Sequence, residues 1–253
     1  MEPDAFSLGT VRQSLIREED TIVFCLIERA KFPRNPHIYE DSKLGVPVSG
    51  SFLKFFVQES EILQAKAGRY EDPVELPFFP DGLPTSLLPP PKQPQGLHPA
   101  AIAASNISAA IWNAYVNEAL PLFTHDGDDG NYALTAAADL ACLQALSRRI
   151  HYGMYVAEVK FRGAPQDYVP AIQSQDREAL MKLLTDQKVE EQVGRRVEKK
   201  AMTFCHEVRI KEKPDDEPPK YKIDPSAAAR LYTQWIIPLT KVVEVDYLLH
   251  RLH

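Results

Sequence analysis

The sequence of 253 residues lacks the features of a membrane or exported protein. A spanning helix needs about 20 consecutive apolar residues, and the longest apolar run here, Ile22 to Ile27, is far shorter. The N-terminal twenty residues are rich in acids, whereas transit peptides are poor in acids and secretory signals need an apolar core. These acids are Glu2, Asp4, Glu18, Glu19 and Asp20. We therefore expect a cytosolic protein with no membrane partner.

Patterns for metals and nucleotide cofactors are also missing. The three cysteines, Cys25, Cys142 and Cys205, have no CxxC spacing, which excludes a zinc site of that type and a disulfide framework. No GxGxxG, Walker loop, GxSxG or HExxH occurs. Asp126 to Asn131 resembles the start of a calcium loop but has no glutamate at the twelfth position. We expect neither a metal nor a cofactor.

Positive charge is not in excess. Lys and Arg number 29 against 35 Asp and Glu, which gives a net charge of -6. Sequence-independent binding of nucleic acid depends on neutralising phosphates, so this chain is a poor candidate for it. The overall balance leaves room for a local basic pocket that binds a small anion.

Glycine is scarce, with 11 residues, whereas proline is plentiful, with 21. Nine of the prolines lie between Pro73 and Pro99. Proline interrupts helices and central strands, so residues 72–99 are predicted to form a long extended connection on the surface. The pair Phe78 and Phe79 is expected to hold this connection against the core.

The rest of the chain has the apolar spacing of helices. The predicted helices cover residues 11–30, 51–66, 99–120, 132–161 and 226–252, the last with a kink at Pro238, and further helices lie between 176 and 209. No alternating strand pattern and no internal repeat is found. The predicted fold is all-α, a helical bundle in which residues 1–253 form one domain.

Several polar residues in these helices are spaced so that they share a face. Arg149 and Lys160 are eleven residues apart, which is three helical turns plus roughly 20°. Asp186 and Glu190 are four apart, and so are Thr240 and Glu244. Arg12 lies beside the apolar stripe of the first helix. Charged pairs at this spacing are common on helix surfaces, so the spacing by itself is a weak signal.

Such a set, if it converges, suits one kind of chemistry. Two arginines and a lysine would bind a dianion or dicarboxylate, while a glutamate and a threonine would hydrogen-bond ether or hydroxyl oxygens. A reaction there would proceed by orientation and electrostatics. The alternative is a non-catalytic helical adaptor that binds an anionic partner in a basic groove.

Several long stretches resemble the all-helical chorismate mutases of plants and fungi, and the resemblance covers the chain from about Ser7 to His253. Its most specific stretches are Gly50 to Leu53, Leu76 to Asp81, Cys142 to Gly153, Val156 to Phe161 and Ile237 to Val245. The resemblance implies conversion of chorismate to prephenate by a Claisen rearrangement, in the synthesis of phenylalanine and tyrosine.

The resemblance also implies a role for each residue of the set. Arg12 and Arg149 match the arginines that bind the substrate carboxylates, and Lys160 and Glu244 match the residues on either side of its ether oxygen. Glu190 matches the acid that holds the ring hydroxyl. Thr240 and Asp186 match residues that line the pocket, although fungal relatives have asparagine at the position of Asp186.

Members of the family are homodimers, and the regulated members bind aromatic amino acids at the subunit interface. The counterparts of that effector site are Gly68, Arg69, Asn131, Ala133 and Leu134. The chain departs from the regulated pattern, because glycine is usual at Ala133 and arginine occurs at Gly68 in the fungal enzyme. A methyl group at 133 would crowd the effector's backbone groups. The resemblance therefore implies an unregulated, cytosolic plant form.

Overall fold

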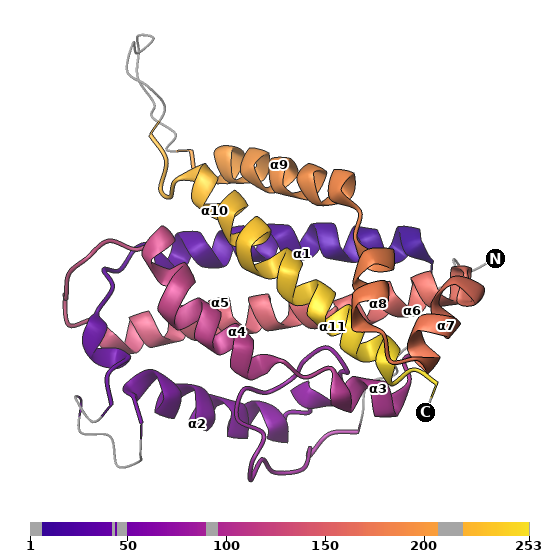
Figure 1. The fold of residues 1–253 in the computed structure, drawn as a ribbon. Helices are drawn as coiled ribbons and strands as arrows, with labels where there is room; N and C mark the ends of the chain where they lie inside the picture. Colours follow the sequence, from indigo (N-terminus) through magenta and orange to yellow (C-terminus); the bar gives the residue numbers. More distant parts are fainter. Residues whose placement is uncertain (1–6, 42–43, 45–49, 90–95, 207–219, 253) are drawn as a thin grey trace.

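The computed structural model describes residues 7–41, 44, 50–89, 96–206 and 220–252. These residues form a bundle of helices in which α1 and α5 lie side by side, α9 packs on the outer side of α1, and α11 crosses beside α6 and α8 (Figure 1). The α-helices are α1 (Leu8–Arg29), α2 (Phe52–Lys66), α3 (Pro99–Ala104), α4 (Ser108–Ala114), α5 (Tyr132–His151), α6 (Gly153–Gly163), α7 (Pro165–Gln173), α8 (Arg177–Leu184), α9 (Gln187–Phe204), α10 (Pro225–Leu231) and α11 (Ile237–Leu249).

The described residues contain no sheet, so the all-α prediction is confirmed. Their only extended pairings are two isolated bridges, Asp41 with Ser51 and His206 with Tyr221. None of the described helices is long and apolar enough to cross a membrane. The core is formed by apolar side chains of every long helix, with Val23, Leu143 and Val243 fully buried.

Helix starts are set by local capping. Ser51 begins α2 by accepting a hydrogen bond from the backbone N–H of Lys54, and Asp176, Asp186 and Asp224 do the same for α8, α9 and α10. Three of these caps are aspartates, whose negative charge also suits the positive end of the helix dipole. Each cap satisfies a backbone donor that has no partner within the helix.

The proline-rich connection behaves as predicted in its described parts, 72–89 and 96–98, which contain no helix or strand; residues 90–95 lie outside the described residues. The backbone N–H groups of Phe78 and Phe79 donate to the two carboxylate oxygens of Glu61 on α2, at 2.6 and 2.9 Å. Both rings pack edge-on against Trp112 of α4. The aromatic pair therefore holds the connection between α2 and α4.

The prediction of one helix over 132–161 is wrong. The helix is interrupted at Tyr152, where α5 ends and α6 begins with Gly153, the residue type other than proline for which a helix is least favourable. The sequence pattern continues across the break because α6 keeps an apolar face. Arg149 and Lys160 consequently lie on different helices, so the assumption of one straight helix behind their spacing is also wrong.

Two other predicted helices are divided. Residues 99–120 form α3, α4 and a π-helical turn, Tyr115–Ala119, followed by a 3₁₀ turn, Leu120–Leu122. A second π-helical turn, Tyr232–Ile236, joins α10 to α11 directly before Pro238. Proline cannot donate to the preceding turn, so the predicted interruption near Pro238 takes the form of this wider turn.

Candidate functional site

A cavity of about 140 Å³ lies between α1, α5, α6, α9 and α11. Six of the seven residues predicted to bind substrate line it, and they come from segments more than 200 residues apart in the chain. They are Arg12, Arg149, Asp186, Glu190, Thr240 and Glu244. The seventh, Lys160, reaches the same site through its contact with Glu244. The structure thus brings the whole predicted set together.

Arg149 is the innermost cation of the cavity. Its side chain is buried near the C-terminal end of α5, whereas its neighbour Arg148 is exposed. The guanidinium donates one hydrogen bond, from Nη1 to the hydroxyl of Thr240 at 3.3 Å, and lies over the ring of Tyr232. Its Nε is buried and has no partner among the described residues. A buried donor without a partner is costly, which indicates a place for an acceptor from a ligand.

Glu244 and Lys160 face each other across the cavity wall. The Lys160 ammonium lies 3.6 Å from Oε2 of Glu244 and donates to the backbone carbonyl of Leu184 at 3.0 Å. Glu244 is buried, and its Oε2 has no hydrogen-bond partner among the described residues. Burial raises the pKa of Glu244, against the opposing positive charges of Lys160 and Arg149. The carboxyl group therefore holds its proton to higher pH than an ordinary glutamate.

The α9 side of the cavity carries Asp186 and Glu190. Asp186 is the N-cap of α9 and accepts from the backbone N–H of Val189 at 3.2 Å, so its carboxylate has a local structural role as well. Glu190 pairs with Lys241 of α11 at 3.0 Å. This ion pair keeps Glu190 directed toward the cavity.

Arg12 lines the cavity from α1 and forms no ion pair with a described residue. Its neighbours on the same wall, Leu8, Val11 and Leu15, are apolar. Arg12 is exposed, so its guanidinium is in contact with water as well as with the cavity.

Sequence reasoning missed Lys241 and the apolar part of the lining. Lys241 lies three residues before Glu244, which is a helical neighbour spacing, so the signal was present in the sequence. The apolar lining consists of Leu8, Val11, Leu15, Val156, Leu184, Val189, Val193 and Ile237. These residues have the pattern of an ordinary helix core, and no sequence signal separates a cavity wall from a packed core.

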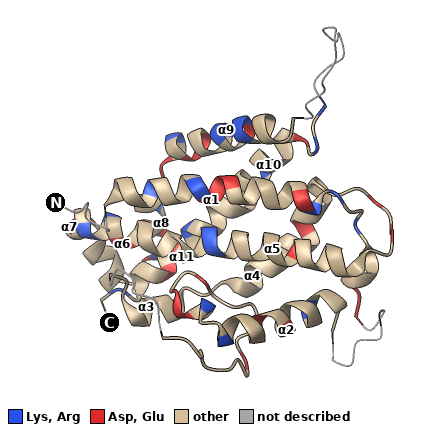
Figure 2. Ribbon diagram, turned by 180° about the vertical axis from the view of Figure 1, so that it is seen from behind, with Lys and Arg blue, Asp and Glu red and all other residues tan. Residues whose placement is uncertain are grey.

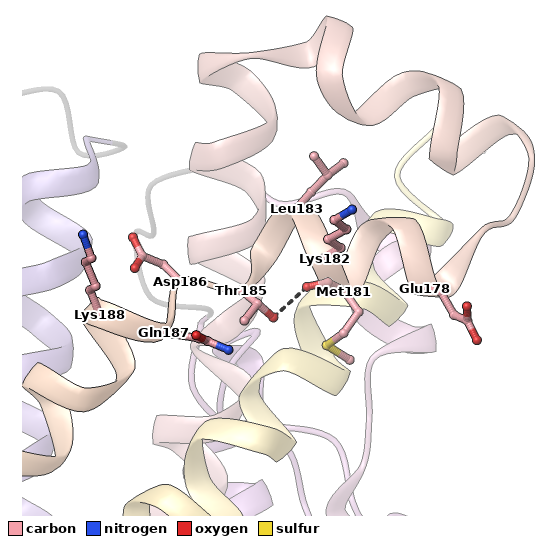
Figure 3. Close-up of a pocket in the computed structure, with 8 residues that line it drawn as sticks. All are labelled: Glu178, Met181, Lys182, Leu183, Thr185, Asp186, Gln187 and Lys188. Atoms are coloured by element: carbon pink, nitrogen blue, oxygen red, sulfur yellow. Dashed lines mark hydrogen bonds between the residues drawn. The ribbon is translucent and has the colours of Figure 1, made fainter.

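An open hollow of about 810 Å³ lies at the turn between α8 and α9 (Figure 3). It shares only Asp186 with the cavity; its other lining residues include Lys182 and Lys188. The charged side chains of the hollow are spread along the turn and do not converge on one point (Figure 3). Convergent and buried polar groups are found in the smaller cavity, which we therefore take as the site.

The geometry suits a small compound with two negative charges and a polar oxygen. Arg12 and Arg149 are cations with no ion-pair partner among the described residues, so both are available for carboxylates. Lys160 and Glu244, whose pKa is raised by burial, lie on the neighbouring helices α6 and α11. The described residues hold no group of three or more His, Cys, Asp or Glu side chains arranged for a metal ion.

The predicted counterparts of an effector site are not together in this chain. Arg69 donates to Glu75 and to Gln144 of α5, while Asn131, Ala133 and Leu134 lie at the other end of α5. Gln144 and Ala133 are eleven residues apart, which is about 16 Å along a helix. One chain therefore cannot bring both groups to one small ligand.

Comparison with known proteins agrees with the resemblance seen in the sequence. The sequence model of one family, chorismate mutase type II, matches residues 131–245. Chorismate mutase 2 of Arabidopsis thaliana is 60% identical, over 98% of this chain and 94% of its own length. The cytosolic chorismate mutase 2 of Zea mays is 51% identical, over 98% of this chain and 97% of its own length.

A solved structure shows the same fold. The crystal structure of AtCM1 with tyrosine bound in its allosteric site superposes with a TM-score of 0.87, at 44% identity, and covers 100% of this chain and 99% of that one. Because identities of this size extend over nearly whole chains, they support the fold and the enzyme class more strongly than a short motif would. The chain belongs to the type II chorismate mutase family and is an isomerase.

Proposed function

We propose that the cavity between α1, α5, α6, α9 and α11 binds chorismate and converts it to prephenate, within aromatic amino-acid synthesis, without a covalent intermediate. The observation that carries this proposal is a pair of buried polar atoms that border the same cavity and have no hydrogen-bond partner among the described residues, Nε of Arg149 and Oε2 of Glu244. Nε of Arg149 can donate a hydrogen bond to a substrate carboxylate. Oε2 of Glu244, when protonated, can donate one to the ether oxygen.

The reaction is intramolecular, because the ether C–O bond breaks while a new C–C bond forms in the same molecule. Arg12 and Arg149 hold the two carboxylates, which restrains the substrate in its reactive pseudo-diaxial form. Negative charge develops on the ether oxygen as its bond lengthens. Lys160 and the protonated carboxyl of Glu244 donate to that oxygen, and Glu190 accepts from the ring hydroxyl.

Glu244→Gln tests the protonation of this carboxyl. The wild-type kcat should fall as pH rises through the raised pKa of Glu244, because the ionised carboxylate cannot donate. The glutamine side chain donates at every pH, so the variant should keep activity and show a flatter profile. The measurement is kcat from about pH 5 to 9, with the exposed Glu191→Gln on α9 as the matched control. If Glu244→Gln lost the same fraction of kcat at every pH, the proposed role of the protonated carboxyl as a donor would be contradicted.

We further propose that residues 1–253 form one catalytic and dimerisation domain, and that the protein is a cytosolic homodimer. The cytosolic location is supported by the maize relative described as cytosolic. Dimerisation is proposed from the resemblance alone, since members of the family are homodimers. Light scattering of the purified protein should give twice the mass of 28.5 kDa.

We expect this chain to be insensitive to aromatic amino acids, although its relative AtCM1 binds tyrosine in an allosteric site. Gly68 has a φ of +81°, and a side chain there would meet Oγ of Ser86 at 2.8 Å, so the local backbone does not suit arginine. Turnover measured with tryptophan, tyrosine and phenylalanine should not change. Activation by tryptophan or inhibition by tyrosine would show that Gly68 and Ala133 do not abolish the response.

The adaptor alternative is less well supported. An acidic partner would need an open basic groove, whereas Arg149 is buried and the acids Glu190 and Glu244 line the same cavity. Basic and acidic residues are interspersed along α1 and α9 (Figure 2). If the purified protein did not consume chorismate, the adaptor hypothesis would be favoured.

A further inference from the structure

Helices α6 and α11 approach each other very closely at Gly153. A Cβ atom on this residue would lie 2.9 Å from the backbone oxygen of Thr240 and 3.0 Å from its Cγ2. It would also lie 3.3 Å from Cγ of Glu244. Real Cβ contacts below 3.0 Å are essentially never seen, and the nearest atom here belongs to the backbone and cannot rotate away.

The glycine is required for space and not for backbone conformation. The positive-φ glycines of the described chain are Gly50, Gly68, Gly82, Gly127 and Gly130, so the φ of Gly153 is open to any residue. Glycine costs about 1 kcal/mol relative to alanine within a helix. At Gly153, the contact with α11 is the feature that offsets this cost.

Both contacted residues belong to the cavity. Thr240 bonds to Arg149, and Glu244 faces Lys160. Oε2 of Glu244 has no hydrogen-bond partner among the described residues, so the packing of its methylene groups helps to position this carboxyl together with the contact with Lys160. The surface against which its Cγ packs is the bare backbone of Gly153.

Gly153 and Lys160 lie on the same face of α6. They are seven residues apart, which is two turns less about 20°, and a helical side chain leans toward the N-terminus of its helix. The lysine therefore extends back toward the level of Gly153, where it meets Glu244 at 3.6 Å. The approach of α6 to α11 sets the separation of these two donors.

We propose that Gly153 is a positioning residue for the reaction, because its missing side chain lets α6 and α11 hold Lys160 and Glu244 on one oxygen. This inference rests on the proposed chorismate mutase reaction. The contact also touches substrate binding, because Thr240 accepts a hydrogen bond from Arg149, so the effect on Lys160 and Glu244 is distinguished by the pH profile.

The test is Gly153→Ala. The added methyl pushes α6 and α11 apart, and misplacing catalytic groups by about 1 Å can cost 10²-fold. We expect kcat to fall by about tenfold to a hundredfold. The groups facing Glu244 are Lys160 of α6, Arg149 of α5, Lys241 of α11 and Tyr168 of α7. Greater separation from Lys160 should move the high-pH fall in kcat to higher pH.

Gly163→Ala is the matched control, since it makes the same change in the same helix where a Cβ would meet nothing within 4 Å. It should keep the wild-type kcat and pH profile. If wild type and this control do not consume chorismate, the proposed function fails. If they do and Gly153→Ala retains kcat within twofold, or loses activity with an unshifted pH profile, the positioning role is overturned.

Gly153→Ala combined with Thr240→Ser covers the case in which the single variant does not fold. The serine removes the contact of Cγ2 at 3.0 Å and keeps that of the backbone oxygen at 2.9 Å, so the double variant is less crowded than the single one while α6 and α11 are still pushed apart. The hydroxyl that bonds to Arg149 is retained. The double variant should fold, as measured by circular dichroism, and should still show the shifted pH profile. If neither variant folds, Gly153 serves the fold alone and the proposal is overturned.

Discussion

Lys160→Ala is expected to lower kcat by about 10²–10³-fold, the scale of losing one preorganised donor to a developing oxyanion. The ammonium lies 3.6 Å from Glu244 and is held by the carbonyl of Leu184, so it is placed before substrate arrives. The loss should appear mainly in kcat, because charge on the ether oxygen develops only in the transition state.

A matched control for this variant is Lys188→Ala, an exposed lysine in the adjacent hollow at the α8–α9 turn. It removes the same charge near the site without touching the cavity. Its kcat should stay within twofold of wild type. Chorismate consumption by Lys160→Ala within a few-fold of wild type would remove the lysine from the mechanism.

The largest expected effect on stability concerns the buried pair of Arg29 and Asp139. The guanidinium donates to Asp139, to the carbonyls of Phe32, Pro33 and Arg34, and to the hydroxyl of Tyr39. Asp139 also accepts from the hydroxyls of Tyr39 and Tyr115. This network joins α1 and α5 to the loop that follows α1.

Arg29→Met should lower the free energy of unfolding by about 3–5 kcal/mol, because it leaves a buried carboxylate without its cation. Urea unfolding at pH 7 measures the change. The pKa of Asp139 is already raised by burial, and removing the arginine raises it further, so the variant favours a protonated Asp139. The difference in free energy of unfolding between wild type and Arg29→Met should therefore become smaller as pH falls. Lys31→Ala, which breaks an exposed pair with Glu28, should change stability by less than about 1 kcal/mol.

If Arg29→Met lost no more free energy of unfolding than Lys31→Ala, the hydroxyls of Tyr39 and Tyr115 would be sufficient to stabilise the buried Asp139. The most direct measurement is the urea midpoint of each variant relative to that of wild type, provided that the proteins unfold with the same dependence on urea concentration. The cavity residues lie elsewhere, so kcat of the folded variant should remain near that of wild type.

Part of the site could be predicted from the sequence, because residues four apart in a helix lie on the same face whatever the rest of the fold is. The spacing of Asp186 with Glu190 and of Thr240 with Glu244 follows from 3.6 residues per turn, and both pairs line the cavity. The resemblance to chorismate mutases joined these pairs to Arg12 and Arg149. Periodicity failed at Gly153, because a helix break needs only a small change in dihedral angles and leaves the apolar pattern intact.

The all-helical class and the extended proline-rich connection could be predicted from the sequence, because both depend on residues that are neighbours along the chain. The packing of the helices was needed to show that Arg149 is buried while Arg148 is exposed, that Lys241 pairs with Glu190, and that Glu244 is buried beside Lys160. It also decided that Gly153 serves a contact with α11. Burial and the resulting pKa of a carboxyl depend on the surrounding helices, and these come from parts of the chain that sequence spacing cannot relate.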